Sequence, residues 1–395
     1  MKIFCYILCV SCLVFSASVG TAAEKVIIAS IFEKSGPGAP DNRATIEGIR
    51  FAVAALNQRG GLLGNQVTLL ELDNQSTALH AKLAAETAVK AGVIAVFGAN
   101  WSSNSLAMAP VLQAARIPMI SPFSTNPDVT KVGDYIFRVC FTDSFQGPVM
   151  AQFALQGLKA KTAGILINAN SRYSEGLAEF FNQSFKKQGG KILFEADYLQ
   201  DTNDFTPYIL KLKRLHPDVV FVPGHNADSV RIIKQAREAG LLIPFLGGDG
   251  WGNEMYDSGG SAIEGNFYSG HWHKDIENKK SRLFAEKYEK KYGKIENSGP
   301  ALAHDVVFLF ADAVRRAGSL RPAKIRDALA ATCNFNGITG NISFNANGDP
   351  IKPVVILEFD QGTSVYVKTI APEQSPDQQC SPKTEAFHLP SGRIP

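Results

Sequence analysis

Hydroxyl side chains gather at two places in the first third of the chain. Ser102 and Ser103 stand at the start of a stretch with apolar residues at helical spacing, and Ser124 and Thr125 lie in a second polar segment after the next apolar run. A helix N-terminus has free backbone N–H groups, so hydroxyls beside it suit an anion such as a carboxylate. The same residue types also serve as ordinary caps and turn residues. The pattern predicts Ser102 or Ser103 as a helix cap and leaves a carboxylate site as the functional alternative.

Asp249, Tyr173 and His225 are the other side chains placed to contact a ligand. Asp249 lies in Leu246-Gly-Gly-Asp-Gly-Trp251, directly after a predicted strand. Glycines let the backbone turn sharply and approach a ligand, and an acidic side chain there can pair with an ammonium group or simply make a turn. Tyr173 and His225 each follow a predicted strand and precede a predicted helix, where a lone tyrosine or histidine is often only a surface residue.

No pattern predicts catalysis or a resident cofactor. The chain has no Ser–His–Asp order, no paired carboxylates and no phosphate-binding loop. His271 and His273 alternate along one predicted strand without a third ligand nearby, so we expect no metal site there. We therefore expect a binding protein without a cofactor, rather than an enzyme.

The elements that position these side chains alternate between strand and helix. Apolar runs predict strands over residues 25–31, 67–72, 93–97, 117–120, 135–139, 163–168, 191–197, 218–222, 243–247 and 266–271. Helical spacing predicts helices over residues 77–92, 147–157, 174–188, 204–215, 226–239, 278–292, 301–317 and 322–331. Such alternation with short connections gives a mostly parallel sheet with helices on both faces. Open parallel sheets bind ligands at the carboxyl ends of their strands, where the candidate side chains lie.

The length of 395 residues exceeds what one hydrophobic core supports, which predicts two domains. The alternation begins afresh after an apparent crossover at residues 141–148, as expected for two similar sheets. Asp41 or Asn42 is predicted to cap the first long helix. Residues 335–368 favour strands and turns, and the polar, proline-containing segment 371–395 is expected to be disordered.

Residues 1–23 have the pattern of a secretory signal peptide. Lys2 precedes an apolar run, and small residues lead to Ala23, after which we expect cleavage. A lipoprotein signal with Cys12 as the acylated residue is the alternative. No later run reaches the roughly 18 apolar residues of a membrane helix. The net charge of +3, from 40 basic and 37 acidic residues, gives no reason to expect a nucleic-acid partner.

Three cysteines remain after the predicted cleavage: Cys140, Cys333 and Cys380. They form neither a disulfide framework nor a metal-binding spacing. Cys140 follows a predicted buried strand, and export leads to an oxidising compartment. Cys333 and Cys380 are therefore a candidate disulfide that ties the tail to the body.

Five motifs together point to a known family: Leu56-Asn-Gln-Arg-Gly-Gly-Leu-Leu-Gly64, Ile120-Ser-Pro-Phe-Ser-Thr-Asn-Pro127, Asp143-Ser-Phe-Gln-Gly-Pro148, Tyr173-Ser-Glu-Gly-Leu177 and Asn347-Gly-Asp349. With them, residues 24 to about 370 resemble the periplasmic solute-binding proteins of ABC importers, in the branched-chain amino acid (leucine/isoleucine/valine-binding protein) family. The resemblance implies a two-lobed α/β fold, each lobe a mostly parallel sheet flanked by helices. It also implies a hinge of three crossings, with one lobe formed by residues 24–143 and 273–356 and the other by residues 144–272 and 357–370.

The resemblance also implies where the two charged groups of an amino acid bind. The family's carboxylate-binding serine falls on Ser102, and its further carboxylate contacts fall on Phe123, through the backbone, and on Thr125, with Ser124 between them. The acidic residue that holds the amino group falls on Asp249.

The aromatic positions of the family are only partly kept. One tyrosine of the second lobe falls on Tyr173, but His225 stands where the leucine-type protein has another. Gln75 and Trp101 stand where that protein has a disulfide, so Trp101 is expected beside the ligand at the mouth of the site. These departures leave the identity of the ligand open.

The function implied by the resemblance is that of a solute-binding component of an ABC transport system. Such a protein captures an amino acid or related small carboxylate between its lobes and delivers it to a permease in the inner membrane. We therefore expect a periplasmic monomer without a nucleic-acid partner. The alternatives are a ligand-sensing protein of the same fold that feeds a membrane receptor, and a binder of a non-amino-acid organic acid or amide.

Overall fold

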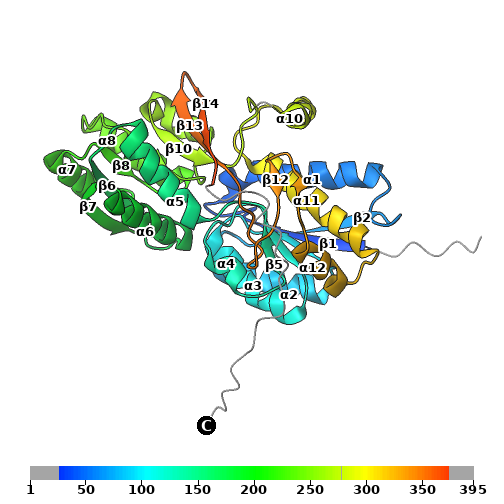
Figure 1. Ribbon diagram of the computed structural model, residues 1–395. Helices are drawn as coiled ribbons and strands as arrows, with labels where there is room; N and C mark the ends of the chain where they lie inside the picture. The colour runs from blue at the N-terminus through cyan, green and yellow to red at the C-terminus, as the bar shows by residue number, and fades with distance from the viewer. Residues whose placement is uncertain (1–25, 277, 373–395) are drawn as a thin grey trace, which may run out of the picture.

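The computed structural model describes residues 26–276 and 278–372, which fold into two α/β lobes (Figure 1). The predicted signal peptide, most of the tail predicted to be disordered, and Cys380 lie outside these ranges. Within them, no helix is long and apolar enough to cross a membrane. The predicted two-lobed α/β class is confirmed.

The first lobe is built on a sheet of five parallel strands in the described part of the chain, in the order β2-β1-β3-β4-β5. The strands are β1 (Val26–Phe32), β2 (Val67–Asp73), β3 (Val96–Gly98), β4 (Met119–Ser121) and β5 (Ile136–Arg138). Their aliphatic residues are buried on both faces, with Ile28 and Phe97 in one core and Ile31 and Val96 in the other. Because the strands are parallel, their carboxyl ends share one edge.

Helices cover both faces of this sheet (Figure 1). The helices of this lobe are α1 (Ala39–Gln58), α2 (Ala78–Lys90), α3 (Ser102–Ala115), α4 (Asp128–Lys131), α10 (Lys279–Tyr292), α11 (Gly299–Ala317) and α12 (Pro322–Ala330). Of these, α10 packs on α1 rather than on the sheet, with Phe284 and Tyr288 against Phe51. On one face α1 packs against α11, which comes from the last third of the chain, through residues such as Ile49 and Phe310. On the other face α2 packs against α3.

The second lobe has a sheet of seven strands in the described residues, in the order β14-β13-β10-β9-β8-β6-β7. They are β6 (Thr162–Asn168), β7 (Lys191–Tyr198), β8 (Val219–Phe221), β9 (Phe245–Gly247), β10 (Phe267–Gly270), β13 (Val354–Asp360) and β14 (Thr363–Ile370). The strands from β7 to β10 are parallel, whereas β13 is antiparallel to both of its neighbours. The predicted mostly parallel sheet therefore ends in an antiparallel edge.

The second lobe also has helices on both faces of its sheet. They are α5 (Asp143–Gln152), the π-helical turn η1 (Phe153–Gly157), α6 (Arg172–Lys187), α7 (Thr206–Leu215), α8 (Asn226–Glu238), α9 (Met255–Gly259) and the 3₁₀ turn η2 (Gly260–Ile263). A small pair, β11 (Phe335–Asn336) and β12 (Asn341–Ile342), adds to the β-rich ending predicted from residue 335. Phe181 belongs to one core of this lobe and Ile233 to the other.

Three local predictions about helix starts are wrong. α1 begins at Ala39 with Gly38 as its N-cap and Pro40 in its first turn, so Asp41 and Asn42 lie inside the helix rather than capping it. Pro favours the first turn because the N–H that it lacks has no partner there. Trp101, not Ser102 or Ser103, is the N-cap of α3, and no side chain caps that helix.

The third case concerns the expected crossover at residues 141–148. It contains the start of α5, which begins at Asp143 after the N-cap Thr142, four residues earlier than predicted.

β13 begins at Val354 and pairs within the second sheet. The predicted lobe boundaries remain a proposal.

Candidate functional site

Two loops of the first lobe are fastened to each other at the carboxyl edge of its sheet. They follow β3 and β4. Ser105 and Ser124 share a hydrogen bond of 2.7 Å between their hydroxyls, and the Ser121 hydroxyl donates to the Ala99 carbonyl oxygen (2.8 Å). All of these groups are buried. The start of α3 and the loop after β4 therefore form one rigid rim.

Ser102 and Thr125 lie on this rim. Ser102 is 1% exposed, and its hydroxyl accepts a hydrogen bond from the Asn126 N–H (3.2 Å). Thr125 is fully buried, and its carbonyl accepts from the Asp143 N–H (2.9 Å), which joins the rim to the start of α5. Ser124 turns its hydroxyl to the carbonyl oxygens of Ala99 and Asn100.

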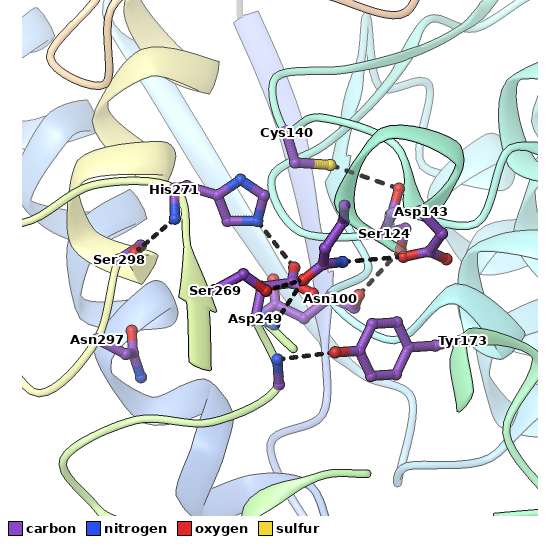
Figure 2. Close-up of polar contacts among 12 residues, drawn as sticks. Asn100, Ser124, Cys140, Asp143, Tyr173, Asp249, Ser269, His271, Asn297 and Ser298 are labelled. Carbon is purple, nitrogen blue, oxygen red and sulfur yellow. Dashed lines mark hydrogen bonds and ion pairs between the residues drawn. The ribbon is translucent and has the colours of Figure 1, made fainter. Parts of the chain in front are cut away.

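Asp249 projects from a tight turn after β9 and is held from two sides (Figure 2). Its N–H donates to Gln146 Oε1 (2.8 Å), and its Oδ2 pairs with His271 Nε2 (2.8 Å). Burial lowers the pKa of His271, while Asp249 opposes this shift. The turn needs glycine, because a Cβ at Gly248 would lie 2.2 Å from the Tyr173 hydroxyl.

Tyr173 and His225 stand on the second lobe beside Asp249. The Tyr173 hydroxyl accepts from the Gly250 N–H (3.1 Å; Figure 2). The His225 ring lies between the rings of Tyr173 (5.4 Å between centroids) and Trp101 (4.4 Å, 17° between planes). Burial lowers the pKa of His225, and Asp228 and Asp249 oppose this. Since Trp101 belongs to the first lobe, this aromatic stack bridges the lobes.

A cavity of about 50 Å³ lies between the lobes. It is lined by six of the eight predicted ligand residues: Trp101, Ser102, Phe123, Tyr173, His225 and Asp249. Ser124 and Thr125 lie behind the lining. The sequence did not predict the other polar lining side chains, Asp41, Asn42, Asn100, Asn226 and Asn297, or Trp251.

The lobes are closed around this cavity. Asn126 Nδ2 donates to the Arg172 carbonyl (2.7 Å), and the Ser103 hydroxyl accepts from the Arg172 N–H (3.1 Å). Asn226 Nδ2 donates to Asp41 Oδ1 (3.0 Å). Each of these bonds joins the first lobe to the second.

The family model for the periplasmic binding protein matches residues 25–364. The chain belongs to this family. It shares its fold closely with the leucine-binding protein of Thermotoga maritima, at 35% identity and a TM-score of 0.85 over 88% of this chain and 99% of that one. The branched-chain amino acid transporter protein of Streptococcus pneumoniae, solved with isoleucine, is 29% identical with a TM-score of 0.84, over 88% and 100% of the two chains. The leucine-specific-binding protein of Salmonella typhimurium is 29% identical over 85% of this chain and 90% of its own length.

The cavity of this family member has two ends with different polar groups. We call Ser102, Tyr173 and Asp249, with the residues that hold them, the α3 end. We call Asp41, Asn42, Asn100 and Asn226 the α1 end, because Asn226 and Asn100 reach α1 by hydrogen bonds to Asp41 and Thr45. The lining contains two acids and, within the described residues, no lysine or arginine.

The pKa values of the acids near the cavity are raised mainly by burial. The pKa of Asp41 rises to about 7, with Asn226 opposing the shift and Asp228 and Glu33 adding to it. The pKa of Glu254 rises to about 8. The pKa of Asp143 is well above its usual range, and Asp249 adds to that shift. Burial therefore disfavours the charged forms of these carboxyl groups, and a positive charge beside them would oppose that shift.

His271 and His273, noted in the sequence for their spacing, have separate roles. His271 pairs with Asp249, and His273 Nε2 donates to the Ser364 carbonyl (3.2 Å). Among the cysteines, Cys140 is free and buried. Cys333 takes part in a disulfide, and since Cys380 lies outside the described ranges, the pairing of these two stays a prediction.

Proposed function

We propose that this protein is the solute-binding component of an ABC importer and that it takes an α-amino acid between its lobes. The observation that carries this proposal is the α3 end of the cavity. A helix N-terminus with Ser102 suits a carboxylate, and Asp249 in the facing lobe suits an ammonium group. A plain organic acid or a neutral amide would leave Asp249 without a cation. Leucine, for which the Thermotoga maritima relative is named, and isoleucine, which the Streptococcus pneumoniae relative binds, have both charges that this end requires.

In the proposed mechanism, Ser102 and the first N–H groups of α3 hold the carboxylate. Phe123, through its backbone, and Thr125 are further carboxylate contacts from the loop after β4. Asp249, fixed by Gln146 and His271, takes the ammonium group. The amino acid then contacts both lobes at once, and these contacts stabilise the closed form relative to the open one. No bond of the amino acid is made or broken.

The remaining parts of the proposal concern location and partners. A signal peptide over residues 1–23 directs the chain to the periplasm, where the closed monomer delivers its amino acid to a permease in the inner membrane. Three crossings form the hinge between a lobe of residues 24–143 and 273–356 and a lobe of residues 144–272 and 357–370. The relatives named above are binding proteins, which supports this role over an enzymatic one.

A thermal-shift panel tests the proposal. The secreted chain, beginning at Glu24, is unfolded and refolded to remove bound solutes and then mixed with each L-amino acid, its decarboxylated amine and its deaminated acid. A ligand that binds only the folded form raises the melting temperature by mass action. We expect at least one amino acid to raise it while its amine and its acid do not. Stabilisation by the deaminated acids alone would reject the ammonium site.

A further inference from the structure

We propose that the α1 end of the cavity takes a cationic group, so that the amino acid bound here has a second ammonium or a guanidinium on its side chain. This inference rests on the proposed function, which supplies the α-amino and α-carboxylate groups held at the α3 end. It departs from the aliphatic ligands of the relatives. Three independent observations support it.

The first observation is the charge balance. An α-amino acid brings one positive and one negative charge, and the α3 end matches both. Asp41 also lines the cavity and has no positively charged side chain beside it there. The described lining contains no lysine or arginine, and the pKa of its one histidine, His225, is lowered. A second positive charge on the ligand restores the balance.

The second observation is a pair of buried oxygens without donors. Asn42 is 1% exposed; its Nδ2 donates to the Gly38 carbonyl (2.8 Å), while its Oδ1 has no partner. Asn100 Nδ2 donates to Thr45 Oγ1 (3.0 Å), and its buried Oδ1 also has none. Each amide is thus held by its nitrogen, and both residues line the cavity. A buried acceptor needs a donor, and an ammonium supplies three and a guanidinium five.

The third observation is that two N–H groups at the start of α1 are already bonded within the protein. The N–H groups of Ala39 and Asn42 donate to the carbonyl oxygens of Gly36 and Gly38 (3.2 Å each). The group that α1 presents to the cavity is therefore Asp41, whose Oδ1 is positioned by Asn226. The Asn226 Oδ1 in turn accepts from the Gly252 N–H (3.1 Å), which fixes the amide.

The aromatic residues complete the fit. Trp101 and Trp251 line the same cavity, and their indole rings suit the methylene stem of a side chain. Indole rings also attract cations. An aliphatic side chain would use these faces but would leave the side-chain oxygens of Asn42 and Asn100 without a donor. A cationic side chain satisfies both.

Calorimetry with matched pairs tests the inference. Each cationic amino acid is compared with the apolar one that has the same carbon chain: L-lysine with L-norleucine, and L-ornithine with L-norvaline. We expect at least one cationic member to bind about 30-fold or more tightly than its partner, as for loss of one member of a buried charge pair. This comparison uses the unaltered protein, so it holds even where a variant fails to fold.

The variant Asp41→Asn then tests whether Asp41 causes the tighter binding of the cationic member of each pair. The variant should lose most of the discrimination within the pair, with little change for the apolar member, whereas Asp201→Asn, at an exposed turn, should keep it. Equal or tighter binding of norleucine, norvaline or L-leucine overturns the inference and leaves the proposed function standing. The inference is also overturned if L-glutamine binds more tightly than every cationic amino acid. In that case Asp41 would be protonated and would donate a hydrogen bond to the neutral side-chain amide. If no amino acid binds, the proposed function itself fails.

Discussion

The α3 end and the α1 end of the cavity differ in which protein groups hold their polar side chains. At the α3 end, Ser102, Tyr173 and Asp249 each have a hydrogen-bond partner within the protein, although the second carboxylate oxygen of Asp249, Oδ1, has none. At the α1 end, the oxygens of Asn42 and Asn100 have none. Side chains that are held in place before binding suit the α-carboxylate and α-ammonium groups, which all α-amino acids share. Such preorganisation lowers the entropy lost by the binding residues when the ligand binds. We expect the α1 end to contact the part of the ligand that varies between amino acids.

The largest effect should come from removing the anchor of the rigid end. Arg138 is fully buried; its Nε pairs with Asp349 Oδ1 (2.7 Å), and its other nitrogens donate to Ser124, Asn126 and Thr130. Arg138→Met leaves Asp349 buried without its cation, so we expect the free energy of unfolding to fall by about 3–5 kcal/mol. Chemical denaturation measures this.

Lys131→Met is the matched control for that experiment. Lys131 is exposed and pairs with Asp128 at the surface (3.0 Å), where such a pair contributes about 1 kcal/mol or less. If the Arg138 and Lys131 variants lose similar stability, the rim after β4 is not held by Arg138, and the contrast between the two ends weakens.

Asp249→Asn should have the next largest effect, on affinity. The variant removes one partner of a desolvated ammonium–carboxylate pair, so we expect amino-acid binding to weaken by about 2–5 kcal/mol in calorimetry. Ser103→Ala removes only an acceptor for the Arg172 N–H between the lobes and should cost about 1 kcal/mol. Equal, small losses for both variants would remove Asp249 from the ammonium site.

The smallest effect should be a pH dependence at His225. Closure buries this side chain between Trp101 and Tyr173, which lowers its pKa, while the open form should have an ordinary value of about 6.5. Protonation therefore favours the open form. The amino acid therefore binds with full affinity above this pH, and its affinity falls as the pH drops below it.

His225→Gln isolates this dependence. Asp41, whose pKa is raised to about 7, titrates in the same range, and Asp228 and Asp249 also face this region. All three acids remain in both proteins, so the difference between the two pH profiles in calorimetry reports His225 alone. Identical profiles from about pH 7.5 to about pH 5 would place His225 outside the closing step.

Most of the fold was predictable because it follows from local patterns. Aliphatic runs such as Val26–Phe32 form buried strands, and helical spacing in residues such as those of α11 gives helices that cover them. The α3 end was predictable for the same reason. Ser102 and Asp249 come directly after strands, and strand ends of a parallel sheet meet at one edge.

The α1 end was not predicted from the sequence, because the local pattern around its residues is also typical of helix caps. Asp41 and Asn42 precede an apolar helical pattern and therefore look like caps, but Pro40 moves the start of α1 forward and turns both to the cavity. Asn297 lies far along the chain, just before α11, and reaches the site only because α11 packs on α1. No spacing in the sequence connects it to Asp41.

The amino-acid sequence alone determined the alternation of strands and helices, the two lobes, and the strand-end positions of Ser102, Tyr173 and Asp249, since each depends on periodicity over a few residues. Only the tertiary structure decided that Asn226 of one lobe meets Asp41 of the other, and that Trp101 stacks on His225. These contacts depend on how the lobes close, and closure is a balance of long-range packing and desolvation that no local pattern encodes.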